Sequence, residues 1–258
     1  MTRTYLVTGA ASGIGRATAD RLRAQGHTVI GADLEGADIE ADLATAAGRA
    51  ALVARTTERT GGRLDAVVAC AGIAAFDPLT VRVNHFGAVA TLEGLRPLLA
   101  AGSDPRAVVV SSVASIHPAD PAIVDAALAG DEEAAAEAAA AAVARGEGHL
   151  VYGSTKAAVA RWIRRTAPTA DWAGAGIPLN AIAPGTITTP MTAPLLADAG
   201  MREVVDASVP MPLHGHATAE QVAPLLDWLT APDNTHVTGQ VVFIDGGADA
   251  VLRGDGAW

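Results

Sequence analysis

Tyr152 and Lys156 are four residues apart, so a helix would place their side chains on one face. A tyrosine has an ordinary pKa of about 10, and one pKa unit corresponds to about 1.36 kcal/mol. A cation about 4 Å from the phenol favours the phenolate by roughly 4 kcal/mol at an intermediate dielectric. The spacing therefore predicts a lowered Tyr152 pKa and a phenol that exchanges protons with an alcohol or ketone. The pair alone is weak evidence, because such pairs also arise by chance on exposed helices.

A glycine-rich turn stands near the start of the chain. The apolar run 4–7 predicts a short strand, the segment 8–15 contains three glycines, and a helical pattern follows. Strand, glycine-rich turn and helix together are the context of a dinucleotide-binding fingerprint. Glycines let the backbone approach a pyrophosphate closely, and the helix N-terminus presents unpaired N–H groups to it. The alternative is a tight turn without a ligand.

Asp33 follows a second apolar run, 27–32, and stands 18 residues after Gly15. This is close to the separation expected for the acid that binds a ribose 2′-hydroxyl. A carboxylate accepts hydrogen bonds from the ribose of NAD and repels the 2′-phosphate of NADP. Arg3 and Arg16 are the nearby basic residues that could favour NADP. We predict NAD as the cofactor, the alternative for Asp33 being an ordinary loop carboxylate.

Composition limits the remaining possibilities. The 258 residues suit one large α/β domain, predicted here to span 1–258, and half of them are hydrophobic. The net charge of −10 argues against nucleic acids and anionic membrane surfaces as partners. Cys70 is the only cysteine, which fits a reducing compartment and rules out an internal disulfide. No cleavable signal or membrane-spanning run is visible, so we expect a cytoplasmic protein. His214 and His216 lack a nearby third ligand, and no metal site is predicted.

Apolar strands alternate with helical patterns along the chain. The predicted strands lie at 64–69, 107–110, 177–182 and 240–244, and predicted helices include 87–99, 155–171 and 219–229. This alternation predicts a parallel sheet covered on both faces, a Rossmann-type doubly wound α/β fold.

With these elements in this order, the chain resembles the short-chain dehydrogenase/reductase family. The resemblance is carried by five motifs: the turn at 8–15, Asn84 in 83–87, Ser112 in 110–113, Tyr152 with Lys156, and the Pro-Gly turn at 184–189. Within the family it is similar to the branch of bacterial 3α-hydroxysteroid dehydrogenases/carbonyl reductases. That similarity is carried by 69–72, a short 72–84 segment, the 40-residue interval from Ser112 to Tyr152, and the tail 245–251.

The resemblance implies roles for the motif residues. Tyr152 would exchange the substrate proton, Lys156 would lower its pKa and bind the nicotinamide ribose, and Ser112 would orient the reacting oxygen. Asn84 would hold a water that connects Lys156 to solvent. Two alternatives stay open: Ser112 as a helix cap, with Ser111 serving equally well, and Asn84 as a structural bridge.

A larger set is implied to contact the cofactor. Asp42 and Leu43 would lie beside the adenine, and Thr189 beside the carboxamide. We expect Cys70, which replaces an asparagine, to be a small buried hydrophobe and not a reactive thiol. The implied set is Gly9, Ser12, Gly13, Ile14, Gly15, Asp33, Asp42, Leu43, Cys70, Ala71, Gly72, Tyr152, Lys156, Pro184, Gly185, Ile187 and Thr189.

Two segments are expected to shape the substrate pocket. One is a substrate loop at about 190–217, rich in apolar residues. The other is a helical insertion at about 116–149, in which Asp131 is the predicted N-cap of an alanine-rich helix that ends near Gly146. The insertion could act as a lid, as a subunit interface, or as a solvated decoration.

Both segments carry few polar groups that could hold a charged substrate. We therefore expect an NAD(H)-dependent oxidoreductase that interconverts a secondary alcohol and a ketone on a bulky, apolar, alicyclic molecule such as a hydroxysteroid or cyclic terpenoid alcohol. The alternatives are a 3-oxoacyl-thioester reductase and a non-catalytic NAD-binding regulator on the same fold. The family resemblance implies an oligomer, and we expect a homodimer, with a tetramer as the alternative.

Overall fold

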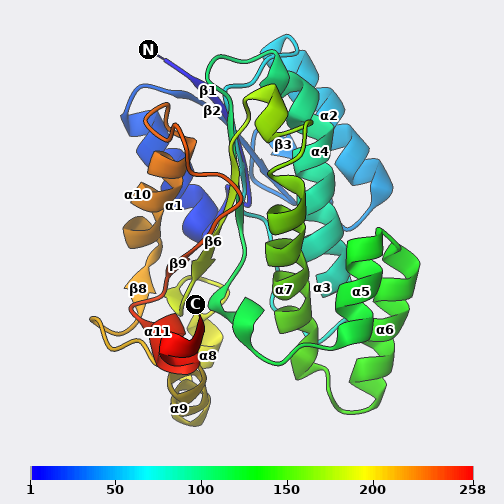
Figure 1. The fold of residues 1–258 in the computed structure, drawn as a ribbon, viewed down its shortest axis with the longest axis vertical. Helices are drawn as coiled ribbons and strands as arrows, with labels where there is room; N and C mark the ends of the chain where they lie inside the picture. The colour runs from blue at the N-terminus through cyan, green and yellow to red at the C-terminus, as the bar shows by residue number, and fades with distance from the viewer. Residues whose placement is uncertain (1, 258) are drawn as a thin grey trace.

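Seven parallel strands form one sheet at the centre of the computed structural model, which describes residues 2–257 (Figure 1). From β1 the strands follow one another outward as β2 and β3 on one side and as β4, β5, β6 and β9 on the other, as in Rossmann-type sheets. A separate pair, β7 (Ile187–Thr188) with β8 (Ala217–Thr218), lies outside this sheet. The order across the main sheet is β3 (Ile39–Glu40), β2 (Thr28–Asp33), β1 (Thr4–Thr8), β4 (Ala66–Ala69), β5 (Arg106–Val110), β6 (Leu179–Pro184) and β9 (Val241–Ile244).

Helices cover both faces of the sheet, which confirms the predicted doubly wound fold (Figure 1). On one face lie α1 (Gly13–Ala24) and α10 (Ala219–Thr230). On the other lie α2 (Ala46–Thr60), α4 (Ala88–Ala100) and α7 (His149–Thr166). The chain closes with α11 (Ala248–Arg253) and a short 3-10 turn, η4 (Gly254–Ala257), and a further 3-10 turn, η3 (Ala173–Ala175), precedes β6.

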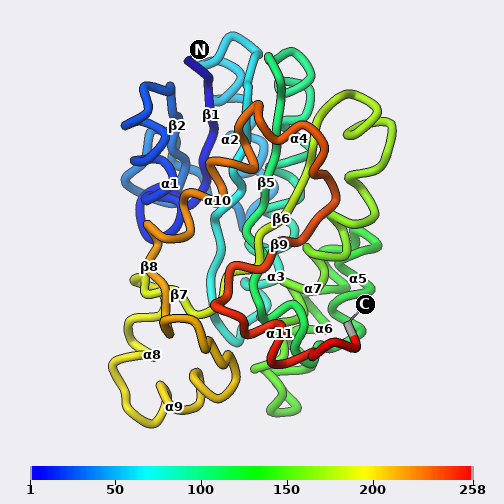
Figure 2. The backbone as a smooth tube through the Cα atoms, turned by 60° about the vertical axis from the view of Figure 1, so that its left-hand side comes forward, coloured from blue at the N-terminus to red at the C-terminus, as the bar shows by residue number. Residues whose placement is uncertain are grey.

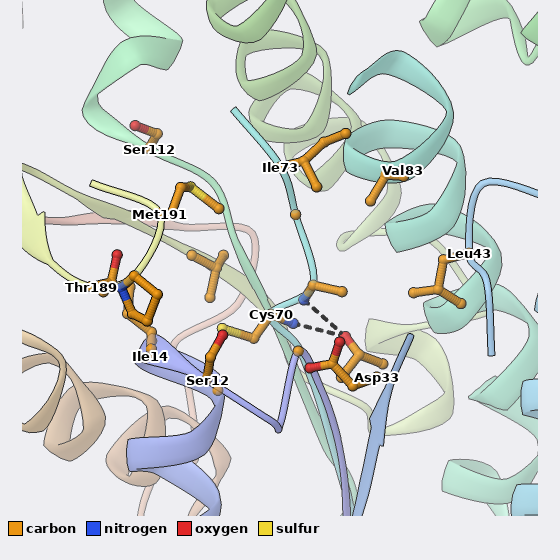
Figure 3. A pocket seen from close by; sticks show the side chains of 18 of the residues that line it. Ser12, Ile14, Asp33, Leu43, Cys70, Ile73, Val83, Ser112, Thr189 and Met191 are labelled. Atoms are coloured by element: carbon orange, nitrogen blue, oxygen red, sulfur yellow. Dashed lines mark hydrogen bonds between the residues drawn. The ribbon is translucent and has the colours of Figure 1, made fainter. Parts of the chain in front are cut away.

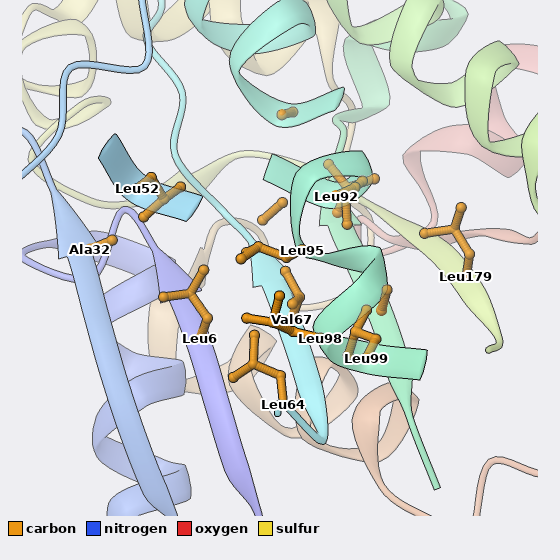
Figure 4. Packing of buried hydrophobic residues seen from close by; sticks show 14 of the residues in the cluster. Leu6, Ala32, Leu52, Leu64, Val67, Leu92, Leu95, Leu98, Leu99 and Leu179 are labelled. Carbon is orange, nitrogen blue, oxygen red and sulfur yellow. The ribbon is translucent and has the colours of Figure 1, made fainter. Parts of the chain in front are cut away.

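The central strands are apolar on both sides because helices cover both sides. Every residue of β4 is buried, and its successive side chains enter different cores: Val67 packs with α2 and α4, and Val68 with α1 and α10. Figure 4 shows Val67 beside Leu6 and Leu95 in the first of these cores. Each fully buried side chain of this size contributes roughly 1.5–3 kcal/mol.

The segment between β5 and α7 forms three short elements. These are a 3-10 turn, η2 (Val113–Ile116), followed by α5 (Pro121–Ala129) and α6 (Glu132–Ala144). Asp131 caps α6 as predicted, because its side chain accepts a hydrogen bond from the Ala134 amide at 3.0 Å. The prediction missed α5. Both helices pack against α7 through apolar side chains, which in α6 are all alanines.

Other boundaries differ from the predicted ones. Helix α7 begins at His149, six residues before the predicted start, so Tyr152 lies well inside it. Before α4 the chain forms a short helix, α3 (Leu79–Val81), and then a π-helical turn, η1 (Arg82–Gly87). The strands β3, β7 and β8 have two residues each and were not predicted.

The expected substrate loop contains two helices, α8 (Ala193–Ala197) and α9 (Ala199–Ser208). Figure 2 shows both together at one end of the molecule, beside β7 and β8. Neither helix buries a side chain. Across residues 2–257, none of the helices combines the length and apolar character needed to cross a bilayer.

Candidate active site

The carboxyl ends of strands in the main sheet surround a cavity of about 270 Å³ (Figure 3). It lies where the strand order reverses between β1 and β4, the usual ligand site of an open α/β sheet. All of the predicted site residues except Asn84 line it. They are Gly9, Ser12, Gly13, Ile14, Gly15, Asp33, Asp42, Leu43, Cys70, Ala71, Gly72, Ser112, Tyr152, Lys156, Pro184, Gly185, Ile187 and Thr189.

The glycine turn packs so closely on itself and on the segment after β4 that side chains would not fit at two of its glycines. A Cβ atom on Gly15 would lie 2.2 Å from the Gly9 carbonyl oxygen, and one on Gly9 would lie 3.0 Å from Ala71. Gly13 begins α1 with a φ of +51°, a conformation that favours glycine. The Ser12 side chain makes no capping hydrogen bond, and no acidic residue occupies the first turn of α1. The start of α1 therefore fits an anion such as a pyrophosphate.

Asp33 ends β2 and lies at the cavity (Figure 3). Its carboxylate accepts hydrogen bonds from the amides of Ala11 at 2.9 Å and Leu34 at 2.7 Å, which fixes its direction. Neither arginine that could have favoured NADP lies in the cavity lining. Arg16 pairs with Asp20 in solvent, and Arg3 is buried at the opposite end of β1, where it donates to backbone oxygens. Within residues 2–257, Lys156 is the only basic side chain that lines the cavity.

Helix α7 places Tyr152 and Lys156 on the same side, as the spacing predicted. The Lys156 Nζ lies 5.6 Å from the centre of the Tyr152 ring and donates a hydrogen bond to the Val110 carbonyl at 3.0 Å. Burial raises the pKa of Tyr152, and the hydrogen bond with Ser112 acts in the opposite direction. Burial lowers the pKa of Lys156 to about 8. The predicted lowering of the Tyr152 pKa is therefore wrong for this structure, because desolvation of the phenol outweighs the opposing effect of Ser112.

The two serines after β5 have different partners. The Ser111 hydroxyl donates to the Lys156 carbonyl at 3.0 Å and joins β5 to α7. The Ser112 hydroxyl accepts from the Ala114 amide at 3.1 Å, so it caps η2, and it also lies near enough to the Tyr152 phenol to act on its pKa. Ser112 therefore both caps η2 and lies beside the Tyr152 phenol, whereas Ser111 joins the end of β5 to the backbone of α7.

The chain is 37% identical over 252 residues to the 3-alpha-hydroxysteroid dehydrogenase/carbonyl reductase of Comamonas testosteroni, covering 96% of this chain and 97% of that protein. Residues 3–124 match the family model described as short chain dehydrogenase. The chain belongs to the short-chain dehydrogenase family. Residues 134–249 of this family member match the model described as enoyl-(acyl carrier protein) reductase.

Two further relatives cover nearly the whole of this short-chain dehydrogenase. The crystal structure of the 3-alpha-hydroxysteroid dehydrogenase from Pseudomonas sp. B-0831 complexed with NADH matches with a TM-score of 0.90 and 42% identity, covering 98% of this chain and 99% of that one. The cis-4-hydroxycyclohexanecarboxylate dehydrogenase of Sinomonas cyclohexanicum is 33% identical over 96% of this chain and 97% of its own.

In this short-chain dehydrogenase, Asn84 is buried beneath the cavity and does not line it. Its side chain bonds both backbone groups of Ile73, accepting from the amide at 2.8 Å and donating to the carbonyl at 2.9 Å. It also donates to the Thr155 hydroxyl at 3.3 Å. The structure thus places Asn84 as a bridge between η1, the segment after β4, and α7, which was the alternative considered from the sequence.

Cys70 packs against the core beside α1 and α10 and also reaches the cavity. Burial raises the pKa of the Cys70 thiol to about 12, so it is a neutral thiol at physiological pH. This agrees with the expected role as a small hydrophobe.

Sequence reasoning missed several residues that line the cavity, among them Thr8, Leu34, Ile73 and Val83. The Thr8 hydroxyl accepts from the amides of Cys70 at 3.0 Å and Ala71 at 3.1 Å, joining the glycine turn to the end of β4 (dashed lines in Figure 3). The sequence feature that could have identified Thr8 is a hydroxyl residue directly before the first glycine of the turn. The three apolar residues carry no comparable signal.

Proposed function

We propose that this protein is an NAD(H)-dependent oxidoreductase that interconverts a secondary alcohol and a ketone on a bulky, apolar, alicyclic substrate. One observation carries the proposal: Ser112, Tyr152 and Lys156 line the same cavity as the glycine turn and Asp33. A proton-exchanging group and a nucleotide cradle in one cavity are what hydride exchange with an alcohol requires.

The cavity offers a place for each part of the dinucleotide. The start of α1 would hold the pyrophosphate, Asp33 the adenine-side ribose, and Asp42 with Leu43 the adenine. When bound, the nicotinamide ring supplies the hydride acceptor or donor. Pro184, Gly185, Ile187 and Thr189 line the cavity next to the reacting side chains.

Tyr152 is the residue proposed to exchange a proton with the reacting oxygen of the substrate. A raised pKa keeps the phenol protonated at neutral pH, which suits it to donate a proton to a ketone oxygen. In alcohol oxidation the same oxygen must accept a proton, and a positive charge entering the cavity would lower the Tyr152 pKa toward that role. Ser112 would donate a hydrogen bond to the reacting oxygen and fix its position. Lys156 is anchored to Val110 at the side of the Tyr152 ring, where its charge supports the phenolate.

An apolar substrate fits the side chains around the mouth of the site. Ile73 and Met191 line the cavity near Ser112 (Figure 3). Helices α8 and α9 leave Leu195, Met201 and Val204 exposed in the expected substrate loop. The named substrates of two relatives, a 3-alpha-hydroxysteroid and a hydroxycyclohexanecarboxylate, are also cyclic alcohols. A hydroxysteroid or a cyclic terpenoid alcohol is therefore our proposed substrate class.

NAD is proposed over NADP on the charges at the ribose end. Asp33 and Asp42 both line the cavity, whereas no arginine among residues 2–257 does so. A 2′-phosphate placed beside the Asp33 carboxylate would meet a like charge. The NADH found with the Pseudomonas enzyme supports the same choice.

The proposal is tested by incubating the purified protein with NAD and a panel of cyclic alcohols that includes a 3α-hydroxysteroid and a cyclic monoterpenol. Formation of NADH, followed by its absorbance, is the expected result, with little turnover when NADP replaces NAD. No turnover with any cyclic alcohol or ketone, despite measurable NADH binding, would overturn the enzyme proposal in favour of a nucleotide-binding regulator.

A competing activity on acyl thioesters has an observation in its favour, since residues 134–249 match a model named for a reductase of acyl-carrier-protein substrates. A 3-oxoacyl-thioester reductase would use this catalytic set equally well. The net charge of −10 disfavours an acidic carrier protein as partner. A 3-oxoacyl thioester included in the panel separates the two, and a higher kcat/KM with that thioester would favour the competitor.

We further propose that the protein is cytoplasmic and forms a homodimer. Light scattering of the purified protein would test the dimer, because it measures the mass of the assembly.

A further inference from the structure

Glu132, the first residue of α6, lies between two arginines from distant parts of the chain. Arg49 Nη2 donates to its two carboxylate oxygens at 2.6 and 2.8 Å, and Arg82 Nη1 donates to one of them at 3.0 Å. The Glu132 and Arg49 side chains are largely covered, with 23% and 12% of their surfaces exposed. Charged hydrogen bonds with so little solvent contact hold their geometry better than exposed pairs do.

Arg49 connects this cluster to the adenine end of the cavity. It lies in the first turns of α2, and the same Nη2 group also donates to the Ala44 carbonyl at 3.3 Å, while its Nε donates to Thr45 at 3.2 Å. The Ala44 amide in turn donates to the Asp42 carboxylate at 2.9 Å. One guanidinium therefore ties the loop that carries Asp42 and Leu43 to the start of α6.

Arg82 connects the cluster to η1, a second element beside the adenine end of the cavity. It begins η1, and the next residue, Val83, lines the cavity on the same side as Leu43 (Figure 3). At the end of η1, a Cβ atom on Gly87 would lie 3.0 Å from Leu43, so this turn packs directly on the loop. Figure 1 shows the α5–α6 hairpin next to α2 and α3.

From this arrangement we infer that Glu132 is a positioning residue for the adenine end of the nucleotide site, acting through Arg49 and Arg82. The α5–α6 hairpin then has a role in cofactor affinity, which none of the three roles considered from the sequence included. The inference rests on the proposed function, because it takes the groove beside Asp42 and Leu43 as the adenine site.

The decisive variant is Glu132→Gln, which keeps the shape and removes the charge shared by both arginines. Its matched control is Glu133→Gln, which removes the same charge from the same helical turn. Glu133 bonds only Arg82 among residues 2–257, and its side chain is 74% exposed. Fluorescence titration of NADH and calorimetric titration of ADP-ribose and of reduced nicotinamide mononucleotide report the two halves of the site separately.

We expect Glu132→Gln to weaken NADH and ADP-ribose by about fivefold, in the range of network mutations that touch no ligand. Reduced nicotinamide mononucleotide, which lacks the adenine half, should bind as it does to the wild type. The KM for NAD should rise in step while kcat at saturating NAD stays the same, and Glu133→Gln should leave all three affinities near the wild-type values. A general loss of folding would instead weaken both halves of the nucleotide together.

Two results separate the inference from the proposed function. Unchanged ADP-ribose affinity in Glu132→Gln, with normal NADH binding by the wild type, would overturn the positioning role alone. Failure of the wild type to bind NADH would overturn both. If Glu132→Gln is poorly folded, Arg49→Lys provides the second measurement, because a lysine keeps the charge but cannot bridge Ala44 and Glu132 through one planar group. It should show the same selective loss of ADP-ribose affinity, and an unchanged affinity would also overturn the inference.

Discussion

The ammonium of Lys156 lies 5.6 Å from the centre of the Tyr152 ring while it donates to the Val110 carbonyl at 3.0 Å. The strand β5 thus holds the lysine in place beside the phenol. Because Lys156 is buried and Tyr152 is half-buried at the cavity, burial raises the pKa of Tyr152 and lowers that of Lys156 to about 8. The proton chemistry of this site depends on what enters the cavity as much as on the pair itself.

Replacing Tyr152 with phenylalanine removes the one group assigned to proton exchange. We expect kcat to fall by about 10²- to 10⁴-fold, the usual contribution of general acid–base catalysis, while the Kd for NADH stays within about twofold. Steady-state kinetics and fluorescence titration measure the two quantities. The other tyrosine of the chain, Tyr5, is buried in the core at β1, so Tyr5→Phe is the matched control and should keep kcat. Comparable kcat in both variants would end the catalytic assignment of Tyr152.

The rate should depend on pH in opposite ways for the two directions. A Tyr152 pKa raised above its ordinary value means that the phenol remains protonated as pH rises. Alcohol oxidation, which needs the phenolate, should therefore accelerate with increasing pH between about 7 and 9, whereas ketone reduction should not. Profiles of kcat/KM in both directions check this. An oxidation rate that is already flat at pH 7 would show that the lysine dominates after all.

The positions in the cavity lining that could be predicted from the sequence depend on local patterns. The glycine turn, the Asp33 position after β2, and the Tyr152–Lys156 spacing each depend on one turn, one strand end or one helix. Such patterns follow from backbone geometry, so a short window of sequence contains the information.

The parts that it did not predict depend on contacts between distant residues. The bond from Lys156 to Val110 spans 46 positions, and those from Asn84 to Ile73 and Thr155 span 11 and 71. The direction of the Tyr152 pKa shift follows from burial, which only the assembled fold determines. Likewise β3 has two residues and exists because β2 offers it an edge, not because of its own pattern.

Cofactor choice should depend on the carboxylate at the end of β2. Asp33→Ala removes the charge that a 2′-phosphate would meet, so the ratio of kcat/KM with NAD to that with NADP should fall by roughly tenfold or more, equivalent to about 1.4 kcal/mol. Most of the change should come from lower kcat/KM with NAD and some from higher kcat/KM with NADP. Asp38→Ala, a nearby carboxylate outside the cavity lining, is the control and should keep the ratio. An unchanged ratio in Asp33→Ala would mean that another group recognises the ribose.

Stability should fall in mild acid because of His85. This side chain is 2% exposed in η1, its Nδ1 has no hydrogen-bond partner among residues 2–257, and burial lowers its pKa to about 4. Between about pH 6.5 and 4 the unfolded chain takes up a proton that the folded chain does not, so this residue destabilises the fold by up to about 3 kcal/mol as pH falls. Urea unfolding at several pH values should show a smaller acid loss in His85→Leu than in the wild type. Parallel curves for the two proteins would contradict the assignment.

The π-helical turn at η1 has a consequence for how the asparagine bridge is specified. Such a turn contains one more residue than the regular helical ladder of α4 that follows it. Deleting a single residue here would restore the regular ladder and rotate the upstream chain by about 100° around the helix axis. The Asn84 amide would then swing away from Ile73 and Thr155. The direction in which the Asn84 side chain points around the helix axis therefore depends on the number of residues in the π-helical turn, as well as on the residue being an asparagine.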